Sequence, residues 1–200
     1  MLGNLGHQSH QGGFINGTDF IIVAGFNGST ASATNKSYVF YTINNTWQEV
    51  DPIPISIGVT HMANIIVRNK FYGCGGYTGG IEGPFAAIPQ CFVYTHGNAP
   101  GTQWSYLPNL PAKRAGGGLV YDKASNSLIF ASGAEVKGEP DKTDTWVLAL
   151  DNVVGGWQSR RPSPYGGNHL GSTTVSYGGV EYHYILGGKS FTIFFLIVSL

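Results

Sequence analysis

The chain has 200 residues, with 11 basic and 11 acidic side chains and a formal net charge of zero, so it lacks the basic surface that DNA- and RNA-binding proteins need. Hydrophobic residues make up 42% of the sequence, enough for a packed core and too many for a disordered chain. The two cysteines are too few for a disulfide-built scaffold or a cysteine-rich metal site.

A repeat organises the chain, and its first landmark is an apolar run that ends in two small residues. The run occurs four times at intervals of 51, 57 and 55 residues, and its last residues are Gly25, Gly76, Gly133 and Gly188. Three of the runs are followed by a second apolar run, a tryptophan and a proline-containing link, and the tryptophans are Trp47, Trp104 and Trp157. This constant order indicates a structural repeat. We interpret the glycine pairs as positive-φ turns and the tryptophans as packing between repeats.

Each repeat consists of short predicted strands. The apolar runs are rich in Val, Ile, Phe and Tyr and are bounded by Gly, Asn and Pro, as β-strands are. Asn16-Gly17 lies between two such runs and is typical of a two-residue hairpin turn. No segment has a helical period over about 12 residues. Four short strands in about 50 residues is the pattern of a β-propeller blade, and a period near 50 is that of the kelch repeat.

The sequence resembles the kelch-repeat family, and the central domain of galactose oxidase has the same build. The resemblance rests on the apolar run with its glycine pair, on the aromatic residue that follows (Tyr41, Tyr94) and on the tryptophan farther on, and it covers roughly residues 6–189. It implies an all-β fold, an incomplete kelch-type β-propeller of about three and a half four-stranded blades in one domain, residues 1–190. The third repeat has Ser132-Gly133 in place of the glycine pair, and the fourth has no second half.

Residues 191–200 form an almost wholly apolar tail after this domain. Ten residues are too few to cross a bilayer, which takes about 20, so we expect no membrane span. The tail is either the product of a truncated or misread gene model or a strand that closes the last half-blade.

A histidine or arginine opens the first predicted strand of every repeat. His10 and His61 lie 14 positions before the first of the two small residues that end the apolar run, and Arg114 and His169 lie 18 positions before it. The kelch resemblance implies that they lie at the mouth of a central channel, beside the long loops that follow each pair. We predict that they form a ligand-binding ring; the alternative is that they hydrogen-bond loop carbonyls and hold blades in register. The acidic residues of one such loop, 134–144, are interpreted as solvated.

These features favour a non-catalytic kelch module that binds a protein or glycan through the loops at the channel mouth. No catalytic residue, metal, cofactor, nucleic acid or membrane span is assigned. The alternative is a fragment of a galactose-oxidase-like copper radical oxidase. The resemblance implies that such an enzyme would need a tyrosine–cysteine cross-link, a second tyrosine and two histidine ligands, and its ligand-bearing motifs are not recognisable in this chain.

Whether Cys74 and Cys91 form a disulfide depends on the compartment in which the chain folds. Cys74 ends the second predicted strand of its repeat and Cys91 begins the third, so antiparallel pairing would place them side by side. Both a disulfide and a pair of buried free thiols are consistent with this arrangement.

Asn-x-Ser/Thr sequons slightly favour a secreted or lumenal compartment, and they begin at Asn16, Asn27, Asn35 and Asn44. Residues 1–13 point the other way, because they lack the charged and apolar regions of a signal peptide.

Overall fold

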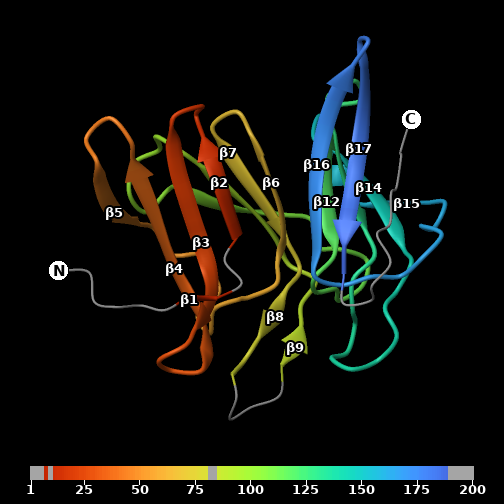
Figure 1. The fold of residues 1–200 in the computed structure, drawn as a ribbon, viewed down its shortest axis with the longest axis horizontal. Helices are drawn as coiled ribbons and strands as arrows, with labels where there is room; N and C mark the ends of the chain where they lie inside the picture. Colours follow the sequence, from red (N-terminus) through yellow and green to blue (C-terminus); the bar gives the residue numbers. More distant parts are fainter. Residues whose placement is uncertain (1–6, 9–10, 81–84, 189–200) are drawn as a thin grey trace.

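The computed structural model describes residues 7–8, 11–80 and 85–188. The candidate ligand-binding residue His10 and the apolar tail, residues 191–200, lie outside the described residues. The described chain is all-β, as predicted, and consists of antiparallel sheets (Figure 1). Within it, the only helix is a single turn of 3-10 helix, η1 (Val153–Gly155).

The first sheet has five strands, one more than predicted. Its short β1 pairs with the end of β3, beside β2. The five strands are β1 (His7–Gln8), β2 (Gln11–Ile15), β3 (Asp19–Asn27), β4 (Ser32–Tyr41) and β5 (Thr46–Val50). The turn between β2 and β3 lies where predicted, and Asn16 and Gly17 both have positive φ. Three residues separate the paired Ile15 and Asp19, so the loop is one residue longer than the predicted two-residue hairpin turn.

The second and third sheets have four strands each, as predicted. The second contains β6 (Ala63–Val67), β7 (Lys70–Cys74), β10 (Cys91–Thr95) and β11 (Trp104–Leu107). The third contains β12 (Gly118–Asp122), β13 (Ser127–Ala131), β14 (Thr145–Ala149) and β15 (Gln158–Arg160). A small hairpin occupies the long loop after β7 and consists of β8 (Tyr77–Thr78) and β9 (Ala86–Ala87). The last sheet has two strands in the described residues, β16 (Leu170–Tyr177) and β17 (Val180–Gly187).

The sheets follow one another in chain order, and their first strands are in contact: β2 with β6, β6 with β12, and β12 with β16 (Figure 1). Hydrophobic clusters fill the spaces between successive sheets. Side chains along β10 alternate, so that Phe92 and Tyr94 pack with the first sheet while Cys91 and Val93 pack with the third. Burial on both faces explains why the middle strands are unbroken apolar runs. Each fully buried large apolar side chain contributes about 1.5–3 kcal/mol to this packing.

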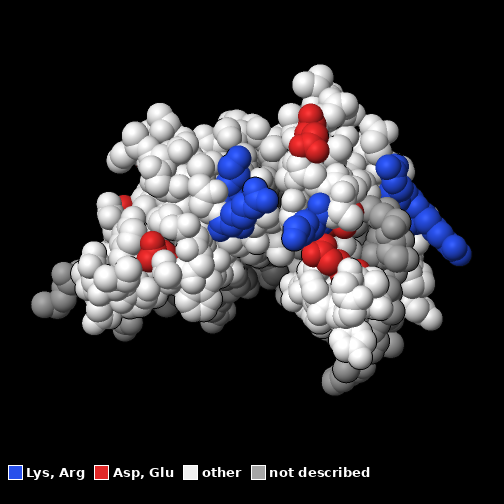
Figure 2. Space-filling view, turned by 90° about the horizontal axis from the view of Figure 1, so that it is seen from above, with Lys and Arg blue, Asp and Glu red and all other residues white. Residues whose placement is uncertain are grey.

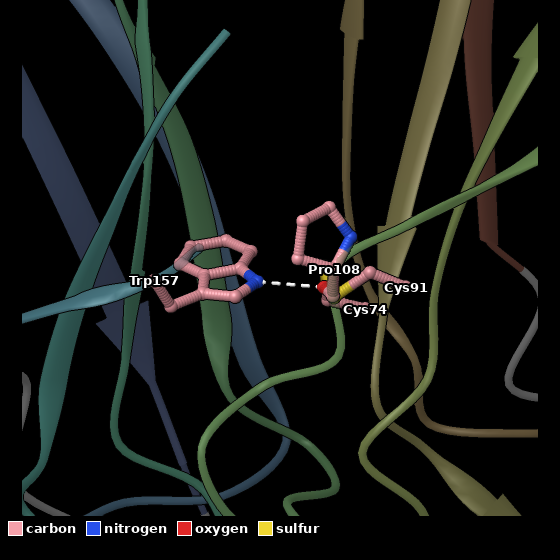
Figure 3. Close-up of a disulfide and its surroundings, with 4 residues drawn as sticks. All are labelled: Cys74, Cys91, Pro108 and Trp157. Atoms are coloured by element: carbon pink, nitrogen blue, oxygen red, sulfur yellow. Dashed lines mark hydrogen bonds between the residues drawn. A yellow bond between two sulfur atoms is a disulfide. The ribbon is translucent and has the colours of Figure 1, made fainter. Parts of the chain in front are cut away.

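Two of the three repeated tryptophans, Trp104 and Trp157, join neighbouring sheets, as predicted. Trp104 Nε1 donates to the carbonyl of Asp51, in the link from the first sheet, at 2.8 Å. Trp157 Nε1 donates to the carbonyl of Pro108, in the link from the second sheet, also at 2.8 Å (Figure 3). Trp47, in the first sheet, instead packs on Phe40 and is 41% exposed.

The glycine pairs adopt the predicted positive φ. Gly75 and Gly76 have φ of 68° and 110°, and a Cβ on Gly75 would overlap the backbone carbonyl of Arg114. This turn therefore needs glycine both for its backbone conformation and for the close approach of the chain that enters the next sheet. Ser132, which departs from the glycine pattern, adopts the same turn with φ of 66°.

Cys74 and Cys91 form a disulfide, one of the two arrangements that the sequence left open. They lie directly opposite each other on β7 and β10, and both are fully buried. Figure 3 shows the bridge beside the contact between Trp157 and Pro108. The covalent link therefore lies where the second and third sheets pack together.

The surface carries few charges. Figure 2 shows basic and acidic side chains dispersed among wide uncharged areas on the face that is uppermost in Figure 1. Among the described residues, no helix is both long enough and apolar enough to cross a bilayer.

Candidate functional site

The loops that follow the second strands meet the starts of the first strands at one end of the molecule, the lower end in Figure 1. A cavity of about 210 Å³ lies among them, lined by His61, Tyr77, Phe85, Lys137, Gly138, Asn168 and His169. These residues come from the segments before β6 and β16, from the loop around β8 and β9, and from the loop after β13. The cavity is thus assembled from three successive repeats.

The two predicted histidines that the structure describes, His61 and His169, meet in this cavity. Their rings make an edge-to-face contact with centroids 4.6 Å apart. Gly116 lies between their backbones: its N–H donates to the His61 carbonyl at 2.7 Å, and its carbonyl accepts from Leu170 N–H at 3.1 Å. Gly116 has a φ of 68°, and a Cβ there would lie 2.7 Å from His169 N. This position therefore needs glycine.

Each imidazole is oriented by the residue that precedes it. Thr60 Oγ1 lies 3.1 Å from His61 Nδ1, and Thr60 exchanges backbone hydrogen bonds of 2.9 and 2.7 Å with Tyr77. Asn168 Oδ1 hydrogen-bonds to His169 Nδ1. The amide nitrogen of Asn168 donates to Asp141 Oδ1. Supporting hydrogen bonds of this kind preorganise a binding site.

Tyr77 and Phe85 form an aromatic wall, with ring centroids 6.2 Å apart. Lys137 Nζ lies 4.4 Å from the centroid of the Phe85 ring, in cation–π geometry. Burial raises the pKa of Tyr77, and the negative charge of Asp141 raises it further, so the phenol remains a hydrogen-bond donor well above neutral pH. The cavity therefore combines aromatic faces with hydrogen-bond donors and one cation.

Arg114 belongs to a different environment from the two histidines. Its side chain is 95% buried; its guanidinium pairs with Asp144 and lies 3.7 Å from Glu135 Oε2. The guanidinium also stacks over the Trp146 ring, 5.0 Å from the centroid. Two carboxylates and an aromatic face thus hold Arg114 against the loop after β13, which fits the alternative of a residue that maintains register. The Glu135 and Asp144 side chains remain 44% and 42% exposed although they face Arg114, so the acidic residues of this loop are solvent-accessible, as predicted.

Sequence reasoning identified two of the cavity residues, His61 and His169, but not the aromatic wall. Tyr77 directly follows a glycine pair, and this position could have indicated it. Phe85 and Lys137 lie within long loops, where no periodic pattern indicates which side chains turn inward.

A second cavity, of about 300 Å³, lies beside η1. Its lining comes from the third sheet and its turns, with Arg160 as the one charged side chain. Because binding sites concentrate on loops that a rigid scaffold brings together, the cavity at His61 is the better candidate.

Comparison with known proteins supports the fold without assigning a family. No protein-family model matches the chain, and no curated protein matches it. A solved structure described as "Structure of YjhT" is similar, with a TM-score of 0.68 and 16% sequence identity over 96% of this chain and 69% of that one. At this identity the likeness concerns the arrangement of the sheets alone.

Proposed function

We propose that the chain is an arc of a kelch-type β-propeller, about three and a half blades long, that binds a protein or glycan at the mouth of the channel. Three observations support the arc: the period near 50 residues, the contacts between successive first strands and the similarity in fold to YjhT. In this proposal the first strands line the channel, and the cavity at His61 lies at its mouth. The convergence of His61 and His169 from two separate repeats carries the binding role.

The chemistry of the cavity favours a small polar group with one apolar face. Its volume, about 210 Å³, is below the roughly 300–1,000 Å³ of sites that enclose drug-sized ligands, so it matches one sugar ring or one side chain of a partner loop. The aromatic wall would stack on the apolar face of that group, and the imidazoles, Asn168 and Lys137 would hydrogen-bond its polar edge. The lining contains no carboxylate, hydroxyl of serine or threonine, or thiol among the described residues, which favours binding over catalysis.

The copper-oxidase alternative fits the described residues poorly. A radical site of that kind needs a cysteine joined to a tyrosine, whereas both cysteines of this chain are joined to each other. They are also fully buried between sheets and do not line the cavity at His61. We therefore derive no reaction through copper.

Saturation-transfer NMR with the full chain tests the binding role. The probes are a panel of free mono- and disaccharides and, separately, a library of short loop peptides. We expect at least one probe to bind, and His169→Ala or Phe85→Ala to weaken that binding at least tenfold. Tyr177→Ala is the matched control, because Tyr177 is an aromatic residue that is 79% exposed and lies outside this cavity. Binding that His169→Ala leaves unchanged would contradict the proposed site, and the class of probe that binds separates glycan from protein.

A further inference from the structure

A second cluster of polar side chains lies at the other end of β12 from Gly116, where the third sheet meets β17. Asp122 is the last residue of β12, and Glu181 and His183 lie two positions apart on β17, on one face of that strand. One ligand atom from each of these side chains lies within 4.8 Å of the other two. Asp122 and His183 are 5% and 3% exposed, and Glu181 is half-buried. Two carboxylates and an imidazole are thus brought together in a largely buried place.

The charges of this cluster are not balanced by a basic side chain. Among the described residues, no lysine or arginine forms an ion pair with Asp122 or Glu181. His183 Nε2 lies 3.6 Å from Asp122 Oδ1, which is too far for a hydrogen bond. Buried carboxylates need a compensating cation or hydrogen bonds. Asp122 accepts hydrogen bonds from Ala124 N–H and from the N–H and hydroxyl of Ser125, and an ion at the cluster would in addition balance the negative charge of both carboxylates.

Another histidine–aspartate pair in the same chain shows what a simple ion pair looks like here. His96 Nε2 lies 3.2 Å from Asp19 Oδ2, a hydrogen bond, and both side chains are nearly as buried as those of the cluster. Among the described residues, no third metal-ligating side chain joins that pair. The longer separation at His183 therefore coincides with the presence of Glu181.

The residues around the cluster orient its ligand atoms toward one another. Thr174 lies opposite His183 in the β16–β17 pair, and its Oγ1 is 2.9 Å from His183 Nδ1. When this hydroxyl accepts a hydrogen bond from Nδ1–H, the lone pair of Nε2 faces the carboxylates, as in metal-bound histidines. Backbone N–H groups hold the carboxylates: Ala124 and Ser125 donate to Asp122 at 3.2 and 3.0 Å, and Lys123 donates to Glu181 at 3.3 Å.

We propose that Asp122, Glu181 and His183 bind a zinc ion that ties β17 to the turn between β12 and β13. Zinc accepts one nitrogen and two oxygen ligands and leaves a fourth position for water. Two ligands of a tetrahedral zinc with bonds of about 2.0–2.1 Å are roughly 3.3 Å apart, close to the 3.6 Å between His183 Nε2 and Asp122 Oδ1. The ion would anchor the two-stranded last sheet to the third sheet. This site is separate from the cavity at His61 and does not depend on the proposed binding function.

Titration of the metal-free full chain with zinc chloride tests the proposal. We expect one equivalent of Zn²⁺ to bind, followed by calorimetry, and we expect the midpoint of thermal unfolding to rise by about 5–10 °C at a hundredfold excess over the dissociation constant. Co²⁺ in place of Zn²⁺ should give the visible absorption of a tetrahedral site. His183→Gln and Glu181→Gln should each weaken Zn²⁺ binding at least tenfold.

Two variants distinguish loss of the zinc ligands from loss of the fold. Glu181 is half-buried, so Glu181→Gln is the variant expected to retain the fold, as checked by circular dichroism. His96→Gln removes the comparison pair and should leave Zn²⁺ affinity unchanged. The proposal is overturned if the native chain binds no stoichiometric Zn²⁺, if Glu181→Gln binds it as tightly as the native chain, or if only Mn²⁺ binds.

Discussion

Removing the Cys74–Cys91 disulfide is expected to lower the free energy of unfolding by about 3 kcal/mol. A cross-link stabilises a protein mainly by restricting the unfolded chain, to an extent that grows with the length of the closed loop. The two cysteines are 17 positions apart, and the chain-entropy relation for a loop of this length gives about 3 kcal/mol at 25 °C. For a chain of 200 residues, this loss corresponds to a fall of about 6–12 °C in the unfolding midpoint.

The measurement compares the oxidised chain with the same chain refolded in the presence of a reductant. Urea unfolding, followed by tryptophan fluorescence, gives the difference in free energy. The reduced chain keeps both sulfur atoms, so this comparison isolates the cross-link. The double variant Cys74→Ala/Cys91→Ala should lose more than the reduced chain, because both positions are fully buried and truncation leaves small cavities.

Two results would refute this reasoning. A difference below about 1 kcal/mol between the oxidised and reduced chains would show that the unfolded chain gains little freedom from reduction. Two free thiols in the unfolded, unreduced protein would show that the bridge does not form at all.

Four further predictions concern packing, the cavity, pH and assembly. Trp157→Phe should cost about 0.5–1.5 kcal/mol, because the carbonyl of the half-buried Pro108 loses its donor. Trp47→Phe, at a 41% exposed position, should change stability in chemical unfolding by less than about 0.5 kcal/mol. Gly116→Ala should destabilise the chain by more than about 1 kcal/mol and abolish probe binding in the NMR assay, since its Cβ would press on His169 N. Burial raises the pKa of Tyr94 well above its usual value, so the folded chain keeps the phenol proton at a pH where the unfolded chain loses it. The stabilisation should therefore be fully present below about pH 10 and fall as the pH rises above it, and absorbance at 295 nm should show delayed ionisation of the tyrosine. Stability that stays constant between pH 9 and 11 would contradict the burial of this phenol. In the described residues β17 pairs with β16 alone, and an open edge strand promotes association. Light scattering should therefore show that the chain self-associates, and Tyr182→Lys should reduce the self-association. A monodisperse monomer at high concentration would disprove this prediction.

Much of the fold could be predicted because its determinants are local. The apolar runs, the Asn16-Gly17 turn and the small pairs such as Gly75-Gly76 specify strands and turns within a few residues of themselves, and the structure has these elements where the sequence indicated them. Trp104 and Trp157 could be interpreted as packing residues because they recur at the same place in successive repeats, whereas the same reasoning failed for the exposed Trp47. The opposition of Cys74 and Cys91 also follows from a short connection between neighbouring strands.

Tertiary structure alone decided how the candidate site is composed. Strand periodicity places His61, Arg114 and His169 at equivalent starts of strands but does not say where their side chains turn. The Arg114 side chain lies against Asp144 and Trp146 because two carboxylates and an aromatic face together stabilise its guanidinium. The two histidines meet because only a glycine separates their backbones. Asp122 and His183 are 61 positions apart in the sequence, and their meeting depends on the stacking of one sheet on the next. Such contacts depend on the relative placement of whole sheets, which packing of their apolar faces determines and which a period of about 50 residues does not encode.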